Sequence, residues 1–257
     1  MLRVLNLTKV YPNGTTALDQ VSFEVQDGEF LAIIGLSGSG KSTLLRCINR
    51  LVEPTSGEIW LDDVSITRAS PAELRRIRRH IGMVFQQFNL VNRSSVWTNV
   101  LSGRLGYTNP LHSLGNYFSR EDREKALQAL QRVGLAEKAD QRADQLSGGQ
   151  QQRVGIARAL MQSPSIILAD EPVASLDPVL AHSILGYLEQ LNQQDKITVL
   201  CSLHYLDLVQ RYATRVIGLR NGVLVYQGDN ADIRALDDTR FKAIYGEEAV
   251  RLGSVTG

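Results

Sequence analysis

The chain has few cysteines, almost no net charge and no long apolar run. It contains 2 cysteines in 257 residues, and its 28 Lys and Arg nearly balance its 27 Asp and Glu. This balance leaves no field that would favour nucleic acid or an anionic membrane surface. No apolar run approaches the ~20 residues of a membrane-spanning helix, and the amino terminus lacks the apolar core of a signal peptide. We therefore expect any membrane role to come through partner chains.

The two cysteines indicate a reducing environment. Cys47 and Cys201 each lie inside an apolar stretch, and neither belongs to a cluster with the spacing of metal ligands. We expect both to be reduced core residues of a cytosolic protein. The overall composition, 43% hydrophobic and 21% charged, is ordinary for a soluble globular protein. A chain of this length suits one large α/β domain, or one domain with a smaller appended lobe.

A phosphate-binding loop, G-x-x-x-x-G-K-S, stands between an apolar run and a helix-like run, which is the context that this motif requires. It reads Gly35-Leu36-Ser37-Gly38-Ser39-Gly40-Lys41-Ser42-Thr43. Glycines let backbone N–H groups turn inward and, with the helix amino terminus behind them, form a cradle for anionic oxygens. Lys41 adds a positive charge for the β- and γ-phosphates of ATP, and Ser42 offers a hydroxyl to Mg²⁺. The alternative, a glycine-rich turn before a helix, is disfavoured by the full context.

A pair of carboxylates follows the short apolar run 165–169 directly. Strand ends in open α/β sheets face the ligand crevice, so Asp170 is placed to complete the Mg²⁺ shell. Glu171, one residue further, is a candidate general base that polarises the attacking water. An isolated Asp-Glu pair is usually a solvated loop end, but the phosphate loop and the buried strand favour the catalytic interpretation.

A second anion-binding helix start lies about a hundred residues after the phosphate loop. It reads Leu146-Ser147-Gly148-Gly149-Gln150. A serine hydroxyl and the bare N–H groups of two glycines open this helix, so the chain carries two phosphate-binding starts. Because a single γ-phosphate needs only one cradle, we infer that the second start serves another nucleotide.

The first part of the chain predicts an antiparallel β lobe, from strand-like runs at 2–7, 21–25 and 58–61. Ser70 and Pro71 then open a helix as its cap and first residue. The basic tail of this helix, which contains Arg75, Arg76, Arg78 and Arg79, admits two interpretations. It is either a nucleic-acid patch or a solvated helix face, and the balanced overall charge favours the latter.

The rest of the chain predicts a parallel sheet flanked by helices. Strands are expected at 81–85, 165–169 and 197–201, helices at 120–133, 150–161, 179–192 and 205–212, and an edge hairpin at 215–226 across Arg220-Asn221. The tail after Gly228 suggests one short helix and a loose end. The fold class is therefore α/β: a P-loop NTPase core with a parallel sheet, an antiparallel β lobe and an inserted helical subdomain.

The inserted subdomain, about 87–162, is predicted to be mainly helical. Glycines and prolines interleave there with apolar residues, and we interpret the apolar side chains as local core rather than binding surface. They are Leu105, Tyr107, Leu111, Leu114, Tyr117 and Phe118, interleaved with Gly103, Gly106, Pro110 and Gly115. We predict an ATP-binding domain over 1–246 and a carboxyl-terminal tail over 247–257.

Taken together, these motifs resemble the ATP-binding subunits of ABC transporters over nearly the whole chain. The motifs that carry the resemblance are G-L-S-G-S-G-K-S, L-S-G-G-Q, I-I-L-A-D-E-P and S-L-D. In that family two domains dimerise head to tail, and each ATP lies between one subunit's phosphate loop and the other's L-S-G-G-Q. The resemblance thus implies a homodimer and accounts for the duplicate cradle.

The resemblance also implies roles for residues outside the main motifs. Tyr11 matches the aromatic residue that stacks on adenine, although it is alternatively a simple turn tyrosine. Gln86 matches the glutamine that contacts Mg²⁺ and water and senses the membrane partner, and His204 matches the histidine that contacts the γ-phosphate. The loop that crosses the dimer interface matches Ser175-Leu176-Asp177. Val173 and Ala174 depart from the threonine or serine and glycine of many relatives, which affects the turn but not the carboxylates.

Several strings resemble the phosphonate import branch of the family, among them P-V-A-S-L-D-P and S-L-H. The implied function is the ATPase subunit of an importer for phosphonate or a related phosphorus oxyanion such as phosphite, a peripheral protein on the cytoplasmic face of the membrane. Its implied partners are a second copy of itself, integral membrane permease subunits and, indirectly, an extracytoplasmic phosphonate-binding protein, without nucleic acid. ATP and Mg²⁺ are the implied ligands.

Three alternatives remain at this point. An ABC importer of another small solute would share every motif, because selectivity lies in the binding protein and permease. A soluble ABC-type ATPase acting on ribosomes or DNA is disfavoured by the single domain and by the absence of a long coiled coil before L-S-G-G-Q. A simple phosphate-loop kinase is disfavoured by L-S-G-G-Q and by Glu171.

Overall fold

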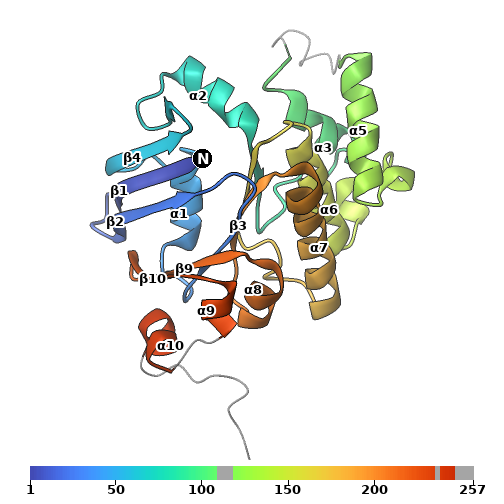
Figure 1. Ribbon diagram of the computed structural model, residues 1–257. Helices are drawn as coiled ribbons and strands as arrows, with labels where there is room; N and C mark the ends of the chain where they lie inside the picture. Colours follow the sequence, from blue (N-terminus) through green and yellow to red (C-terminus); the bar gives the residue numbers. More distant parts are fainter. Residues whose placement is uncertain (109–117, 235–237, 247–257) are drawn as a thin grey trace, which may run out of the picture.

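Two β-sheets organise the chain in the computed structural model, which describes residues 1–108, 118–234 and 238–246 (Figure 1). The smaller sheet is antiparallel and has the strand order β2-β1-β4-β5. Its strands are β1 (Leu2–Val10), β2 (Thr16–Val25), β4 (Ser56–Leu61) and β5 (Val64–Ser65). The antiparallel lobe predicted from the sequence is therefore confirmed.

The larger sheet has the strand order β10-β9-β3-β8-β7-β6, and all of its pairs are parallel except the edge pair of β9 and β10. Its strands are β3 (Phe30–Ile34), β6 (Ile81–Val84), β7 (Ile166–Ala169), β8 (Thr198–Ser202), β9 (Arg215–Arg220) and β10 (Val223–Asp229). The central strands are apolar and buried on both faces, as parallel strands covered by helices must be. The hairpin turn is Asn221-Gly222, one residue later than predicted, because both residues adopt the positive φ that a tight hairpin requires.

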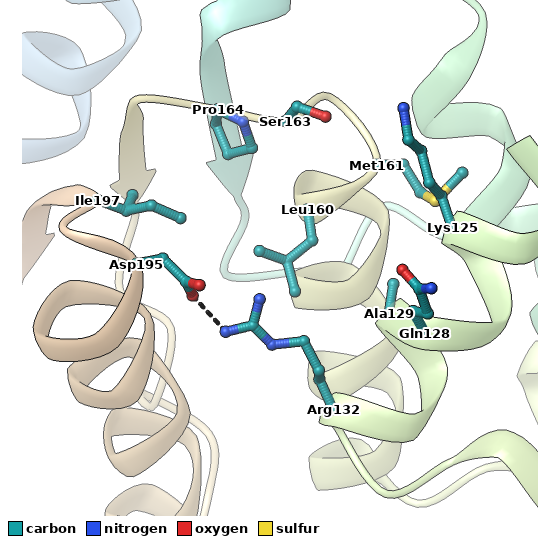
Figure 2. A pocket seen from close by; sticks show the side chains of 10 residues that line it. All are labelled: Lys125, Gln128, Ala129, Arg132, Leu160, Met161, Ser163, Pro164, Asp195 and Ile197. Carbon is teal, nitrogen blue, oxygen red and sulfur yellow. Dashed lines mark hydrogen bonds and ion pairs between the residues drawn. The ribbon is translucent and has the colours of Figure 1, made fainter. Parts of the chain in front are cut away.

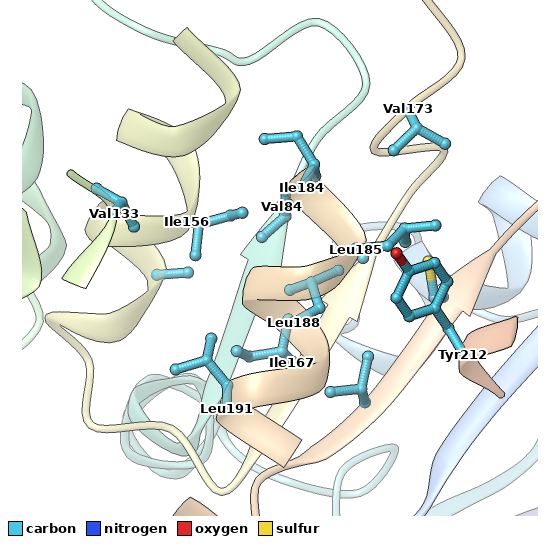
Figure 3. Close-up of a cluster of buried hydrophobic side chains, with 14 of the residues drawn as sticks. Val84, Val133, Ile156, Ile167, Val173, Ile184, Leu185, Leu188, Leu191 and Tyr212 are labelled. Carbon is cyan, nitrogen blue, oxygen red and sulfur yellow. The ribbon is translucent and has the colours of Figure 1, made fainter. Parts of the chain in front are cut away.

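Alternate residues of the larger sheet enter two separate cores. Phe30, Ala32 and Ile34 of β3 join one cluster, whereas Leu31 and Ile33 join the other. The first core packs against α6 (Gly148–Leu160) and α7 (Pro178–Asp195), and Figure 3 shows its side chains gathered between these helices and the sheet. The second core packs against α1 (Lys41–Ile48) and the antiparallel sheet. Consequently α1 and α6 lie on opposite faces of the larger sheet (Figure 1).

Helices fill the chain between β6 and β7. The helix α5 (Arg120–Arg132) was predicted and is confirmed, with Ser119 as its cap. The short helix α3 (Val96–Leu101) was not predicted, although Ser95 caps it through the Thr98 N–H group. The predicted residues Pro110, Leu111, Leu114, Gly115 and Tyr117 lie outside the described residues. Three 3₁₀ turns lie in the same part of the chain, η2 (Ser102–Arg104), η3 (Ala136–Lys138) and η4 (Ala143–Gln145), and a fourth, η1 (Arg78–His80), precedes β6.

The basic segment at 75–79 is partly used inside the fold. Helix α2 (Pro71–Ile77) begins with the predicted Ser70 cap, which Glu73 completes as a capping box. Arg78 donates to the backbone oxygens of Asn49 and Arg50, 3.0 and 2.7 Å away, where α1 ends. A cation at a helix carboxyl end is favourable, so Arg78 joins two elements rather than belonging to a free nucleic-acid patch.

The tail contains more regular structure than the sequence indicates. After α8 (Leu206–Tyr212), two helices follow Gly228 instead of one: α9 (Asn230–Arg234) and α10 (Asp238–Tyr245). Phe241 and Ile244 of α10 are buried against the first core. The prediction of one short helix was wrong. The helix α10 buries two apolar side chains in eight residues, which gives too weak a helical periodicity of apolar residues to be recognised in the sequence. The predicted tail segment, 247–257, lies outside the described residues.

Both cysteines are buried and free, as the sequence predicts. Burial raises the pKa of the Cys47 thiol to about 12 and also raises that of Cys201. Both thiols are therefore protonated and unreactive near neutral pH. Over the three described stretches, no helix combines the length and apolar character needed to cross a membrane.

Candidate nucleotide site

The carboxyl ends of four adjacent parallel strands gather the candidate catalytic residues. In the order β3-β8-β7-β6, the strands are followed by the phosphate loop, by His204, by the pair Asp170 and Glu171, and by Gln86. Ligands of open α/β sheets bind at this edge. Segments that are far apart in the sequence are thus gathered at one edge because the strands that precede them are neighbours.

Two glycines of the phosphate loop cannot be replaced without moving its backbone. Gly35 has φ +144°, and a Cβ atom there would lie 2.2 Å from the backbone oxygen of Leu219. Gly40, which precedes α1, has φ +107°, and its Cβ would lie 2.5 Å from the backbone oxygen of Ala17. The backbone of the loop therefore packs closely against the start of β2 and the end of β9. This packing holds the N–H groups of the loop in position.

Lys41 is buried at the centre of the loop, with 3% of the residue exposed. Its Nζ atom donates to the backbone oxygens of Gly35 and Leu36, at 2.9 and 3.0 Å, and lies 3.7 Å from Glu171 Oε1. Burial lowers the pKa of Lys41, and the nearby carboxylates oppose this shift. The ammonium group thus forms a preorganised cation at a small hollow lined by Ala17, Gly38, Gly40, Lys41, Ser42, Thr43 and Glu171.

Glu171 and His204 form a hydrogen-bonded pair across β7 and β8. The distance from His204 Nε2 to Glu171 Oε1 is 2.7 Å. Glu171 has φ +46°, and its N–H group donates to Ser202 Oγ at 2.8 Å. A non-glycine residue in this conformation is strained, and such strain is often found at functional sites. The fold thus aims the Glu171 carboxylate at the hollow beside Lys41.

Loss of the His204 imidazole should slow turnover more than it weakens ATP binding. In His204→Ala, Glu171 loses a hydrogen-bond partner, and the γ-phosphate would lose the donor that the family resemblance implies. We expect kcat to fall by about 10²-fold, the usual effect of removing one donor to a developing charge. Steady-state hydrolysis combined with fluorescent ATP-analogue binding measures both quantities. A loss confined to binding would contradict the assignment.

Asp170 has a carboxylate oxygen that is buried without a hydrogen-bond partner. The residue is 1% exposed, its Oδ2 atom accepts from Arg46, and its Oδ1 atom contacts no donor among the described residues. The sequence did not single out Arg46, because an arginine within an amphipathic helix gives no motif. No group of three His, Cys, Asp or Glu residues that could hold a metal occurs within the described ranges.

The donors Asp170 Oδ1 and the Ser42 hydroxyl nevertheless fit Mg²⁺. This ion prefers oxygen ligands and normally keeps waters and substrate phosphates in its shell rather than an all-protein cage. A buried carboxylate oxygen without a partner is costly unless a cation or donor completes it. The site therefore suits a magnesium ion that arrives with its nucleotide.

Tyr11 lies at the edge of the phosphate loop. Its hydroxyl is 3.4 Å from Thr43 Oγ1, and the Lys9 ammonium lies 5.2 Å from its ring centroid. The half-buried residue belongs to a turn closed by two backbone hydrogen bonds, from the Tyr11 N–H group to the Thr15 oxygen and from the Gly14 N–H group to the Tyr11 oxygen. The structure thus shows the turn tyrosine, held beside the start of α1, and stacking on adenine stays a prediction.

Gln86 is exposed and lies two residues after the end of β6. The segment that follows it is hydrogen-bonded to α6. Phe88 and Asn89 both have positive φ. The Arg158 guanidinium on α6 donates to their backbone oxygens at 2.9 and 2.5 Å. Burial lowers the pKa of Arg158. These two hydrogen bonds join the segment after Gln86 to α6, whose amino terminus carries L-S-G-G-Q.

The L-S-G-G-Q segment does not face the phosphate loop of its own chain. Ser147 caps α6 and forms a capping box with Gln150, so the motif folds as the predicted helix start. Leu146 is buried in the first core, whereas α1 belongs to the second. Between residues 35–43 and 146–150, all of them described, no hydrogen bond or ion pair forms. The helix that follows the phosphate loop, α1, and the helix that L-S-G-G-Q opens, α6, thus pack against different faces of the larger sheet.

The interface loop 175–177 lies beside L-S-G-G-Q. Asp177 caps α7 by accepting from the Leu180 N–H group at 3.0 Å. A Cβ atom at Gly148 would lie 3.6 Å from a methyl group of Leu176. Ser175 is exposed and carries no contact that fixes a role. Two of the segments predicted to meet a partner chain therefore form one continuous surface.

A second hollow lies at the opposite edge of the sheet, among α5 and the starts of β7 and β8 (Figure 2). Two cations line it, but each already has a carboxylate partner. Arg132 reaches across it to Asp195, and Lys125 pairs with Glu121 at 2.7 Å. Because none of the predicted site residues lines this hollow, it is not part of the nucleotide site.

Comparisons with known proteins agree with this geometry. A family model described as ABC transporter matches residues 18–174. The phosphonates import ATP-binding protein PhnC of Shouchella clausii is 54% identical over 246 residues, which cover 96% of this chain and 91% of the relative. The protein of the same name from Bdellovibrio bacteriovorus is 53% identical over 250 residues, covering 97% and 95%.

Solved structures give the same result. A dimeric post-hydrolysis state of an ATP-binding cassette bound to ADP and phosphate is 38% identical, with a TM-score of 0.79 over 90% of this chain and 99% of that one. A nucleotide-free cassette from an ABC transporter is 33% identical, with a TM-score of 0.82 over 95% and 98%. The predicted P-loop NTPase fold is thereby confirmed.

Proposed function

The chain belongs to the ABC transporter family as one of its ATP-hydrolysing cassettes, and we propose that it energises the import of phosphonates or a related phosphorus oxyanion such as phosphite. The observation that carries the substrate class is the identity of more than half of all positions, over nearly the full chain, with relatives named for phosphonate import. The arrangement of Lys41, Glu171 and His204 supports the ATPase activity itself.

Each residue of the site has a proposed role in hydrolysis. The backbone N–H groups of 35–43 cradle the phosphates, and Lys41 neutralises the β- and γ-phosphate oxygens. Glu171 accepts a proton from the attacking water, while His204 orients the γ-phosphate and supports the Glu171 carboxylate. Tyr11 stacks on the adenine ring at the mouth of the loop.

Ser42, Asp170 and Gln86 are the proposed magnesium ligands. Bound Mg²⁺ would neutralise the charge that develops on the phosphate oxygens during hydrolysis. Asp170 supplies a carboxylate oxygen that is already desolvated and free of donors. Gln86, at the exposed end of β6, would add an amide oxygen and report the state of the site to the segment that follows it.

The active form is proposed to be a head-to-tail dimer of two copies. The packing of α1 and α6 against opposite faces of the larger sheet supports this proposal, because it separates the helix behind the phosphate loop from the helix that L-S-G-G-Q opens. Ser147 and Gly149 would contact the γ-phosphate held by the partner chain. Residues 175–177 would cross the interface beside them. Hydrolysis removes the shared ligand and lets the two copies separate.

The proposed partners of the cassette are two integral membrane permease subunits. An extracytoplasmic phosphonate-binding protein would deliver the solute to them. The cassette would sit peripherally on the cytoplasmic face of the membrane. The segment that begins at Gln86 and continues through the predicted helical subdomain, about 87–162, would contact the permease. These contacts would differ between the ATP-bound dimer and the separated copies, and only through such a difference can nucleotide shift the conformation of the permease. The link from Arg158 to Phe88 and Asn89 supports this route.

Uptake by a strain lacking this chain's gene tests the proposed substrate class. Cells complemented with the wild-type chain would be given labelled 2-aminoethylphosphonate, methylphosphonate, phosphite or orthophosphate under phosphate starvation. We expect restored uptake of at least one of the first three. Hydrolysis of ATP by the purified protein without restored uptake of any of them would retain the family and reject the phosphorus-oxyanion importer.

The variant Lys41→Ala should abolish uptake in that strain, because it weakens ATP binding and removes the charge that neutralises the β- and γ-phosphate oxygens. Charge-assisted hydrogen bonds contribute about 1.5–3 kcal/mol each, so ATP affinity should fall by roughly 10- to 100-fold. Fluorescent ATP-analogue titration measures the loss directly. The matched control is Lys125→Ala, which removes only a surface ion pair with Glu121. Equal ATP affinity in the two variants would reject the role of Lys41.

A further inference from the structure

Arg46 forms an ion pair with the buried carboxylate of Asp170. It lies one helical turn after Ser42 on α1, and its guanidinium donates to Asp170 Oδ2 at 3.1 Å. The Asp170 side chain is 1% exposed and the Arg46 side chain 47% exposed. The arginine therefore reaches inward from the solvent side of α1 to one edge of this carboxylate.

Among the described residues, Arg46 is the one cation in an ion pair with Asp170. Lys41 is close enough to act on Asp170 electrostatically, but its ammonium group is occupied by two backbone oxygens and by Glu171. A buried carboxylate is costly to leave without a partner. The pair with Arg46 therefore fixes which oxygen of Asp170 is occupied and which is free.

The free oxygen is Oδ1, which accepts no hydrogen bond from any residue in the described ranges. We propose that Arg46 is a positioning residue for the metal site: by holding Oδ2 of Asp170 from the side of α1, it presents Oδ1 to the magnesium ion that accompanies ATP. This inference rests on the proposed function, because the ion enters with the nucleotide. It adds to the proposed ligand set a residue that touches neither metal nor nucleotide.

A guanidinium suits this role better than an ammonium group. It is planar, remains charged at all relevant pH values and directs its N–H groups along fixed lines. Partners of metal ligands commonly set the orientation of the ligand, and their loss typically lowers metal affinity by about 10- to 100-fold. Arg46 is also half-exposed, so replacing it leaves no cavity in the core.

The test compares Arg46→Met, Arg46→Lys and the control Arg75→Met, which removes an exposed arginine from α2. In the presence of a non-hydrolysable ATP analogue, Mn²⁺ binding is followed by electron paramagnetic resonance. The half-saturating Mg²⁺ concentration for hydrolysis is measured in parallel. For Arg46→Met we expect Mn²⁺ affinity to fall about 10-fold or more, with a matching rise in half-saturating Mg²⁺. Arg46→Lys should lie between wild type and Arg46→Met.

Two results would overturn the inference. Unchanged Mn²⁺ affinity in both Arg46 variants would make the ion pair purely structural, and increased affinity would make Arg46 a competitor of the metal. Circular dichroism shows whether Arg46→Met is folded. If it is not folded, the Mn²⁺ affinity of Arg46→Lys alone decides whether the inference holds. A wild-type protein that binds no ATP analogue would instead reject the proposed function, so the two failures are distinguishable.

Discussion

The variant Glu171→Gln is expected to bind ATP and to remain dimeric with it, while hydrolysis falls by about 10²- to 10⁴-fold. The loss corresponds to removal of a general base. Glutamine keeps the shape of glutamate and can still accept from His204 across the 2.7 Å contact, so the strained backbone at 171 is preserved. Only the ability to take a proton from water is lost.

Light scattering coupled to size-exclusion chromatography measures this effect. With Mg²⁺ and ATP the variant should elute as a dimer, and with ADP as a monomer. Glu189→Gln is the matched control, because Glu189 is also paired with a cation, Arg211, but lies on α7 away from the strand ends. A variant that remains monomeric with ATP, or that hydrolyses ATP at the wild-type rate, would remove Glu171 from the proposed mechanism.

The residues at the strand ends were predictable because their local context is unambiguous. A buried apolar run that ends in a motif indicates both a parallel strand and the edge at which ligands bind. The phosphate loop and the pair Asp170 and Glu171 satisfy this condition. His204 follows such a strand as well, but its contact with Glu171 depends on β7 and β8 being neighbours, which no local pattern in the sequence indicates.

Other features depend on contacts that no local pattern contains. Arg46 reaches Asp170 across 124 sequence positions, and nothing in the sequence around α1 distinguishes it from a solvated arginine. The helix α3 is short and begins in a segment whose hydrogen bonds run to Ala139 and Gln141. In each instance tertiary packing decides the structure, and a periodicity argument over one window cannot detect it.

Substitution of Ser147 by aspartate is expected to abolish the ATP-bound dimer without weakening ATP binding to the same chain. Aspartate caps helices as well as serine does, so α6 should keep its start. The added carboxylate would face the γ-phosphate held by the partner chain. A like charge within about 4 Å costs on the order of 4 kcal/mol at an effective dielectric constant of about 20, enough to prevent association.

The charge effect is isolated by Ser147→Asn, which caps the helix, has nearly the same size as the aspartate variant and carries no charge. In the Glu171→Gln background, Ser147→Asn should still form dimer with Mg²⁺ and ATP, whereas Ser147→Asp should stay monomeric. Both should bind a fluorescent ATP analogue with the affinity of the parent, because residues 146–150 lie on the other face of the sheet from the phosphate loop. Weaker binding by the monomeric Ser147→Asp chain would mean that the two half-sites act on one nucleotide within a single copy. Dimerisation by both variants would mean that the γ-phosphate does not meet Ser147 at all.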